Sequence, residues 1–216
     1  MDRRSTSVED HPSHIQLITD PRQIADKEAQ NGLRQFDEVL RIIREEKWDF
    51  KLSPDTIKRL QWFAIDGLWS SAGEFRRHRV EIKNSKHLPP HFDQVPVLVG
   101  RMCDYANDHT DDPIHVSAYL MWRLNWIHPF GDGNGRTSRA LSYLALSIGY
   151  KMELPGFPTI PDLILRDKNP YYGAIDAADA AWDERRPEVD VKEMEHLIKS
   201  LLSTQLLSVS PENPDC

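Results

Sequence analysis

The sequence has few cysteines, no long apolar run and no excess of positive charge, and each shortage excludes a class of protein. Two cysteines in 216 residues, Cys103 and Cys216, are too few for a disulfide framework or a cysteine metal site. We expect both to be free thiols without a functional role. No run of 18 apolar residues occurs, and the first 20 residues lack the apolar centre of a signal peptide. We therefore expect a cytoplasmic protein with no membrane partner.

The charge balance also limits the partners. Lys and Arg number 27 and Asp and Glu number 34, which gives a formal net charge of −7 at pH 7. No overall positive field is available to hold a phosphate backbone, so we expect no general nucleic-acid binding. The 39% hydrophobic and 28% charged residues are typical of a globular protein. We expect one domain.

Helical spacing of apolar residues dominates the middle of the chain, between a loose N-terminal arm (1–20) and a frayed C-terminal tail (208–216). Most of the expected helices begin at a polar cap or a proline. They cover about residues 21–46, 54–71, 95–106, 113–127 and 134–149, with two more that open at Pro170 and Pro187. Residues 21–207 are therefore predicted to form a single helical domain.

One short segment has the pattern of a strand. Residues 79–83 alternate polar and apolar side chains, and Pro89 and Pro90 exclude a helix after them. Since no other segment alternates in this way, the sheet should be no larger than a small β-hairpin. The predicted fold class is all-α with one β-hairpin.

The segment that carries chemistry is residues 128–139, with the sequence HPFGDGNGRTSR. Its glycines let backbone N–H groups approach an anion, and the helix that begins near Asn134 directs its positive end to the same place. Arg136 and Arg139 lie three residues apart, on one helix face, where both can reach a polyphosphate. These features predict a phosphate site.

Two further side chains of this segment fit a reaction at a phosphate. Asp132 offers a hard oxygen ligand for Mg²⁺ shared with phosphate oxygens. His128 is suited to accept a proton near neutral pH. Other phosphate and metal motifs do not fit, because a P-loop needs Gly-Lys-Ser/Thr and an EF-hand needs an oxygen ligand where Arg136 stands.

At these residues the sequence resembles the Fic family, whose signature is His-Pro-Phe-x-Asp/Glu-Gly-Asn-Gly-Arg-x-x-Arg. Every fixed position is matched, and the resemblance covers about residues 20–150. It implies a Fic-type helical domain with a small β-hairpin flap. It also implies a protein adenylyltransferase, which transfers AMP from ATP to a Ser, Thr or Tyr hydroxyl of a target protein.

The resemblance assigns a role to each motif residue. His128 would be the catalytic base, and Asp132 would hold Mg²⁺ or Mn²⁺. Phe130 would fix the loop by entering the core. The residues that would bind the nucleotide are Gly133, Asn134, Gly135, Arg136 and Arg139.

The segment from Gly73 to Pro90 resembles the entry to the family's target-binding flap. The flap residues are Val80, Ile82 and His87, and an exposed edge strand here would take a target segment as a neighbouring strand. A hairpin covered by the protein's own helix is the alternative interpretation. His87 and His91 have a spacing that resembles a metal pair, but we expect no ligand role.

Many Fic proteins are inhibited by a glutamate in a Ser/Thr-x-x-x-Glu-Gly/Asn helix, which pairs with the second motif arginine, here Arg139. Glu212 matches that pattern at the end of the chain but has Pro211 inside it. Glu28 has Ile24 and Ala29 at the flanking positions of the pattern. Both glutamates are candidates, with Glu28 preferred because a packed helix fixes a carboxylate better than a tail. A solvated surface role is the alternative for each.

The resulting hypothesis is an enzyme with ATP as substrate and a divalent cation as cofactor. Its partners would be a hydroxyl-bearing target protein, the chain itself through self-modification, and an inhibitory partner protein. Two alternatives stay open, namely transfer of another nucleotide or phosphate-linked group and a non-catalytic peptide-binding module.

The remaining aromatic and histidine side chains suggest structural roles. Four tryptophans are expected to pack in the core, namely Trp62, Trp69, Trp122 and Trp126. His78, His109 and His115 are expected at the surface or in caps.

Overall fold

Eight α-helices form nearly all the regular structure of the residues that the computed structural model describes, which are 6–8, 11–46, 50–183 and 189–209. The helices are α1 (Pro21–Glu45), α2 (Pro54–Ile65), α3 (Val95–Asp108), α4 (Pro113–Ile127), α5 (Asn134–Gly149), α6 (Ile160–Arg166), α7 (Asn169–Ala181) and α8 (Lys192–Leu207). The other elements are the 3-10 turn η2 (Phe92–Gln94) and the strands β1 (Thr6–Val8) and β2 (Val80–Ile82). The predicted all-α class is confirmed.

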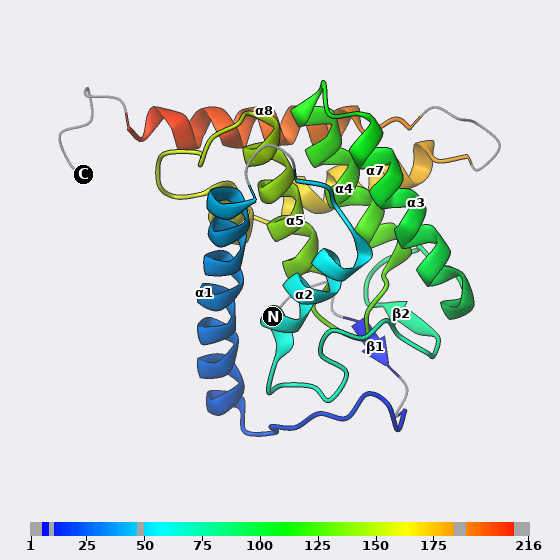
Figure 1. Cartoon of the computed structure of the whole chain (residues 1–216). Coiled ribbons are helices and arrows are strands. Elements are labelled where there is room, and N and C mark those ends of the chain that lie inside the picture. Colours follow the sequence, from blue (N-terminus) through cyan, green and yellow to red (C-terminus); the bar gives the residue numbers. More distant parts are fainter. Residues whose placement is uncertain (1–5, 9–10, 47–49, 184–188, 210–216) are drawn as a thin grey trace.

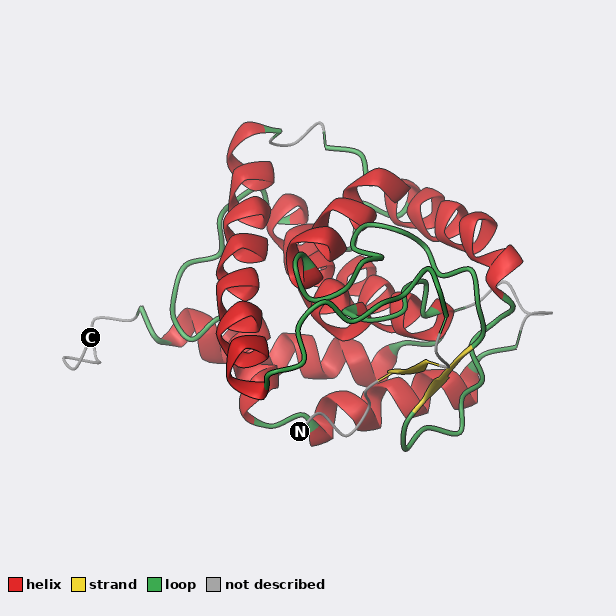
Figure 2. Cartoon of the chain, turned by 90° about the horizontal axis from the view of Figure 1, so that it is seen from below, coloured by secondary structure: helices red, strands yellow, loops and turns green. Residues whose placement is uncertain are grey.

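Helices α4 and α5 lie at the centre of the molecule, with α1 on one side, α3 on the other and α8 across one end (Figure 1). Most side chains of α4 are buried, because α3, α5, α7 and α8 all pack against it. Figure 2 shows the packed helices and the two strands from below. Helices α4 and α5 matter for function because residues 128–133 join them. We call these residues the motif loop.

Capping fixes where several helices begin, as the sequence predicts. The side chains of Asp20, Ser53 and Asp112 accept backbone N–H groups in the first turns of α1, α2 and α4, each of which has a proline at its start. The second helix is shorter than expected, because Asp66 leaves the helical conformation and Gly67 takes a left-handed φ of 74°. The seven-residue α6 was not expected from the sequence.

The sheet differs from the predicted hairpin. Strand β2 pairs antiparallel with β1, and the register aligns Thr6 with Ile82 and Val8 with Val80. The partner strand therefore comes from the N-terminal arm, more than seventy residues away along the chain, and Figure 2 shows the two strands side by side. The sequence could not reveal this partner, because ladder hydrogen bonds join backbone groups that every residue carries.

The N-terminal arm also differs from the expected loose segment. Beyond β1, its described residues run along the chain that follows α2: Leu17 N–H donates to the Leu68 carbonyl at 2.8 Å, and Ser70 N–H donates to the Ile15 carbonyl at 2.9 Å. The His14 ring stacks on Trp69 with centroids 4.1 Å apart. Backbone bonds, side-chain hydrogen bonds and ring stacking hold this segment, so it needs no hydrophobic period.

Three other expectations can be compared with the structure. Trp122 is buried, but Trp62 is 37% exposed and Trp69 lies outside a helix, so the predicted core role is wrong for Trp62. Cys103 is buried, and burial raises the pKa of its thiol to about 12, which keeps it protonated. No described helix is both long and apolar enough to span a bilayer. Pro187 and residues 210–216 of the expected tail lie outside the described residues, as does Cys216.

Candidate active site

The candidate site is the loop between α4 and α5. His128 caps α4 in a left-handed conformation, with φ 51° and ψ 58°, and α5 begins six residues later at Asn134. Phe130 is 0% exposed and anchors the loop in the core, as the resemblance implies. Because α4 and α5 pack against each other, both ends of the loop are fixed.

Side chains brace the loop from within and from α2. The Asn134 amide accepts the Phe130 N–H at 3.0 Å and donates to the Phe130 carbonyl at 2.9 Å. Gln61 donates to the Asp132 carbonyl at 3.0 Å and accepts the Gly73 N–H at 2.6 Å. The Asn134 side chain therefore forms hydrogen bonds within the loop. Its predicted contact with a phosphate would then be made by its backbone N–H.

Gly133 occupies the N-cap of α5 with a φ of 81°, a conformation that favours glycine. A Cβ at this position would lie 2.8 Å from the Ile65 side chain, so α2 closes one side of the loop. The first N–H groups of α5 have no carbonyl four residues earlier in the helix. They lie at the positive end of the helix dipole, where an anion is stabilised.

His128 is buried and held in one tautomer. Its Nδ1 lies 3.2 Å from the Asn125 carbonyl oxygen, which can only accept, so Nδ1 carries the proton. Desolvation lowers the pKa of His128 to about 3, so the imidazole is neutral at pH 7 and Nε2 has a free lone pair. Nε2 lies 2.9 Å from Thr6 Oγ1. A neutral imidazole in this tautomer can accept a proton from a hydroxyl.

Arg76 joins the loop to the flap segment. Its guanidinium donates to the His128 carbonyl at 2.8 Å, to the His78 carbonyl at 3.1 Å and to the Pro90 carbonyl at 2.6 Å. The side chain is 4% exposed, and desolvation lowers its pKa to about 10. Arg76 belongs to the segment that resembles the flap entry, but its role as a clamp on carbonyls of three segments was not expected.

Asp132 and Arg136 are paired in the structure. Asp132 Oδ2 lies 3.0 Å from Arg136 Nη2, and Asp132 Oδ1 accepts the Gly133 N–H at 2.6 Å. Among the described residues, no cluster of three or more His, Cys, Asp or Glu side chains could hold a metal ion by itself. One carboxylate with hard oxygens fits Mg²⁺ only if the phosphates of a nucleotide supply further ligands.

Arg139 differs from Arg136 in making no ion pair with a described residue. It is 6% exposed, and its Nη1 lies 3.3 Å from where a Cβ on Gly135 would stand, so the side chain turns back to the first turn of α5. Within the described part of the chain, no carboxylate pairs with it. Burying an unpaired cation is costly. An anion at the start of α5 would remove that cost.

The predicted flap residues have different environments. Val80 is buried and Ile82 is half-buried, both in β2. His87 donates from Nε2 to the Trp126 carbonyl at 2.7 Å, which ties the flap to the end of α4. The β2 edge expected to receive a target is paired with β1.

Of the two candidate inhibitory glutamates, the structure describes Glu28 alone. Glu28 on α1 reaches the motif, but its Oε1 lies 3.2 Å from Nη1 of Arg136, whereas the pattern requires contact with Arg139. The difference follows from the position of Glu28 on α1, which packs along α2 and α5. Glu212 lies outside the described residues.

His78 was expected at the surface or in a cap, and that prediction is wrong. It is 9% exposed, and its ring lies 4.8 Å from the ring of His11 and 5.8 Å from that of His14. Neither ring nitrogen has a hydrogen-bond partner among the described residues. Desolvation lowers the pKa of His78 to about 4, and His11, His14 and Arg76 add to the shift. His115 is also partnered, by Tyr105 and Glu195, whereas His109 is exposed.

We expect the free energy of unfolding to fall as the pH is lowered from about 6.5 towards 4, because the pKa values of His78 and His128 are both lower in the folded chain than the ~6.5 of an unfolded one. His78 accounts for part of this fall. The unfolded chain binds the proton first, so the stabilisation is complete above pH ~6.5 and decreases below it. Urea midpoints at pH 7.5 and 5.0 measure this fall.

The matched variants are His78→Phe, which keeps a ring of similar shape, and His109→Gln at an exposed site. His78→Phe should shrink the fall in midpoint between the two pH values, and His109→Gln should not. An equal fall in wild type and His78→Phe would contradict the assignment to His78.

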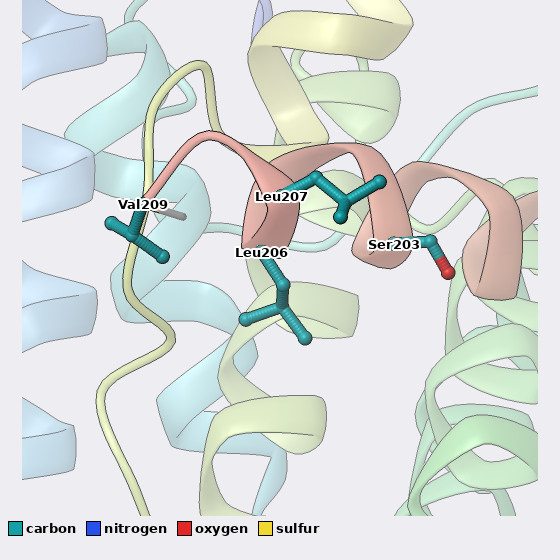
Figure 3. A pocket seen from close by; sticks show the side chains of 4 residues that line it. All are labelled: Ser203, Leu206, Leu207 and Val209. Carbon is teal, nitrogen blue, oxygen red and sulfur yellow. The ribbon is translucent and has the colours of Figure 1, made fainter. Parts of the chain in front are cut away.

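Two of the pockets lined by described residues lie at different places. One of about 510 Å³ is lined by Ser203, Leu206, Leu207 and Val209 near the end of α8 (Figure 3). Figure 1 places that end of α8 far from β1 and β2. The other, of about 250 Å³, adjoins the motif loop at Gly131 and is also lined by Arg76 and His78. The second pocket therefore belongs to the candidate site.

Known proteins that resemble this chain belong to the family whose signature residues 128–139 match. A sequence model of the Fic/DOC family matches residues 51–146. A stretch of 82 residues is 40% identical to the protein adenylyltransferase Fic of Drosophila willistoni and 39% identical to that of Drosophila melanogaster. These matches cover 36% of the chain and 16% of each relative, so the chain spans about a sixth of the length of these relatives.

Solved structures have the same fold. A Fic family protein from Desulfovibrio desulfuricans superposes with a TM-score of 0.63 at 22% identity, over 90% of this chain and 56% of the other. A Fic domain-containing signalling protein from Bacteroides thetaiotaomicron gives 0.65 at 20%, over 82% and 69%. A VirB-translocated effector of Bartonella tribocorum, solved with bound AMPPNP, gives 0.60 at 14%, over 85% and 88%.

Proposed function

The chain is a Fic domain protein, and from this membership we propose that it transfers AMP from ATP to a hydroxyl group of a protein. One observation carries the proposal. Nε2 of the neutral His128 imidazole lies within hydrogen-bond distance of the Thr6 hydroxyl oxygen. The same loop-and-helix unit carries Arg139, which is buried and has no ion pair with a described residue. This arrangement supports a proton acceptor and an anion site in one motif.

The proposed reaction divides the work between His128 and the start of α5. His128 takes the proton of the attacking hydroxyl at Nε2, while the Asn125 carbonyl holds the other ring nitrogen. The backbone N–H groups of the first turn of α5 and the guanidinium of Arg139 hold the phosphates. Positioning and electrostatic stabilisation dominate, because phosphoryl-type transfer asks little covalent chemistry of the protein.

Asp132 would hold the divalent cation, which when bound neutralises charge on the phosphates. In the described state, Arg136 occupies one oxygen of that carboxylate. Binding of the nucleotide would therefore require Arg136 to leave Asp132 and take a phosphate as its partner. In this exchange the divalent cation would replace Arg136 at Asp132, whereas Glu28 would lose its pair with Arg136.

The proposal is tested by incubating the full chain with cell lysate and ATP that is labelled on either the α- or the γ-phosphate. Transfer of AMP labels protein from α-labelled ATP alone. Protein label from γ-labelled ATP alone would instead indicate transfer of the terminal phosphate, and no label from either would contradict the proposal. Repeating the α-labelled experiment with other nucleotides tests the alternative that another nucleotide is transferred.

We expect Glu28 to restrain the enzyme weakly. Its contact with Arg136 is 49% exposed on the glutamate side and 23% on the arginine side, and such pairs contribute about 0.2–1 kcal/mol. Glu28→Gln should therefore raise self-labelling by no more than about fivefold. Glu45→Gln is the matched control, because Glu45 makes an exposed pair with Arg41 on the same helix. A rise in the control equal to that in Glu28→Gln would refute the role.

A chain that ends at Ser208 tests Glu212 in the same assay. A rise in that truncated chain, without one in Glu28→Gln, would assign the inhibition to the tail.

A further inference from the structure

The N-terminal arm places a hydroxyl group on the candidate catalytic base. Thr6 Oγ1 lies 2.9 Å from His128 Nε2. Because the Asn125 carbonyl fixes the proton of the neutral ring on Nδ1, Nε2 can only accept in this contact, and the Thr6 hydroxyl must donate. The hydroxyl proton therefore points at the base, which is the arrangement required of an attacking nucleophile.

The position of Thr6 is fixed by the sheet. Thr6 pairs with Ile82 in the antiparallel β1–β2 ladder, so its backbone lies against the flap strand. The arm thus occupies one edge of β2 as a neighbouring strand, as a target segment would do in strand addition. Figures 1 and 2 both show β1 alongside β2.

The following part of the N-terminal arm is anchored next to the motif loop of the same chain. His14 stacks on Trp69, and its Nδ1 lies 2.5 Å from Ser71 Oγ. Its ring also covers Gly131 of the motif loop, because a Cβ there would lie 2.6 Å from the ring. Only seven residues separate Thr6 from His14, so the tether gives the Thr6 hydroxyl a high effective concentration at the base.

We propose that Thr6 is an acceptor of AMP in this protein and is modified by the site of its own chain. The proposal rests on the proposed adenylyltransferase function and adds the acceptor. Thr6 Oγ would form a bond to the α-phosphorus of ATP, and the bond from that phosphorus to the bridging oxygen of the β-phosphate would break. Pyrophosphate leaves with that electron pair, and His128 Nε2 takes the hydroxyl proton.

The arm and an external target then compete for one site. While β1 is paired with β2, neither the flap edge nor the base is free for another hydroxyl. Weakening the anchor at His14 should lower modification of Thr6 and raise modification of other proteins. His14 is not a motif residue, so His14→Ala weakens the anchor of the arm and leaves every motif side chain in place.

The test uses the full chain with α-labelled ATP and Mg²⁺, followed by trypsin digestion and mass spectrometry of the fragment that spans residues 5–22. We expect one adenylyl group on Thr6. Thr6→Val, which keeps the branched shape without the hydroxyl, should abolish label in this fragment, and Thr6→Ser should retain it. Ser5→Ala and Ser7→Ala are matched controls that remove the neighbouring hydroxyls and should retain the label.

Mixing active chain with a tagged His128→Ala chain tests whether the reaction stays within one chain. Label on the active chain alone supports the proposal, and equal label on Thr6 of the tagged chain overturns the intramolecular step.

Failure of this proposal can be distinguished from failure of the proposed function. If lysate proteins gain the α-label while Thr6 stays unmodified, the adenylyltransferase function stands and the acceptor role is wrong. A gain of lysate labelling in Thr6→Val without label on Thr6 in wild type would likewise overturn it, and would make the arm a blocking segment. If no protein gains the α-label, both proposals fail.

Discussion

Replacing His128 with alanine should lower AMP transfer by about 10²–10⁴-fold, the usual loss when a general base is removed. The imidazole is the group within reach of a hydroxyl, at 2.9 Å, whereas the loop amides and Arg139 would hold the nucleotide. The loss should therefore appear in kcat, with ATP affinity nearly unchanged. Transfer to a fixed target, together with calorimetric titration of ATP, measures both.

A second variant is needed to distinguish loss of the base from a change in backbone stability at position 128. A left-handed φ of 51° is less favourable for alanine than for asparagine, so His128→Ala carries a folding cost unrelated to chemistry. His128→Asn tolerates the conformation and also lacks the base, so both variants should lose transfer equally. His109→Ala, at an exposed site, is the control and should keep full activity. Wild-type turnover in His128→Asn would refute the assignment of the base.

Removing the carboxylate of Asp132 should abolish metal-dependent transfer. A cation at the phosphates contributes several kcal/mol of charge stabilisation, so we expect Asp132→Ala to lose on the order of 10²-fold or more in activity. Titrating Mg²⁺ into wild type after removal of metal by a chelator should restore activity along a saturating curve. The variant should show little response to the cation.

The alternative outcome for Asp132 is also informative. Because Asp132 pairs with Arg136 at 3.0 Å, the variant frees that guanidinium to bind phosphate. If activity were to rise in Asp132→Ala, or if a chelator left wild-type labelling unchanged, the metal role would be wrong. Asp111→Ala, at an exposed carboxylate, controls for the loss of one negative charge. Zn²⁺ should replace Mg²⁺ poorly, because the donors are hard oxygens.

The amino-acid sequence by itself determined the helices and the contents of the motif loop. Apolar spacing and the caps at Asp20, Ser53 and Asp112 placed most helix starts, because these signals act within one or two turns of the chain. The order of residues from His128 to Arg139 likewise placed a histidine, a carboxylate and two arginines in one loop and the first turns of the helix that follows it. All of these relations are local in sequence.

The tertiary structure alone decided which distant groups meet at that loop. It paired β2 with residues 6–8, brought Glu28 to Arg136 instead of Arg139, and buried His78 and Arg76 beside the motif. A polar residue on the core-facing side of α2, Gln61, was a sequence signal for the brace at Asp132, but nothing near Thr6 indicated its partner. Backbone ladders and long-range polar contacts depend on how the helices pack, and packing sums weak contacts over the whole chain, which no local pattern records.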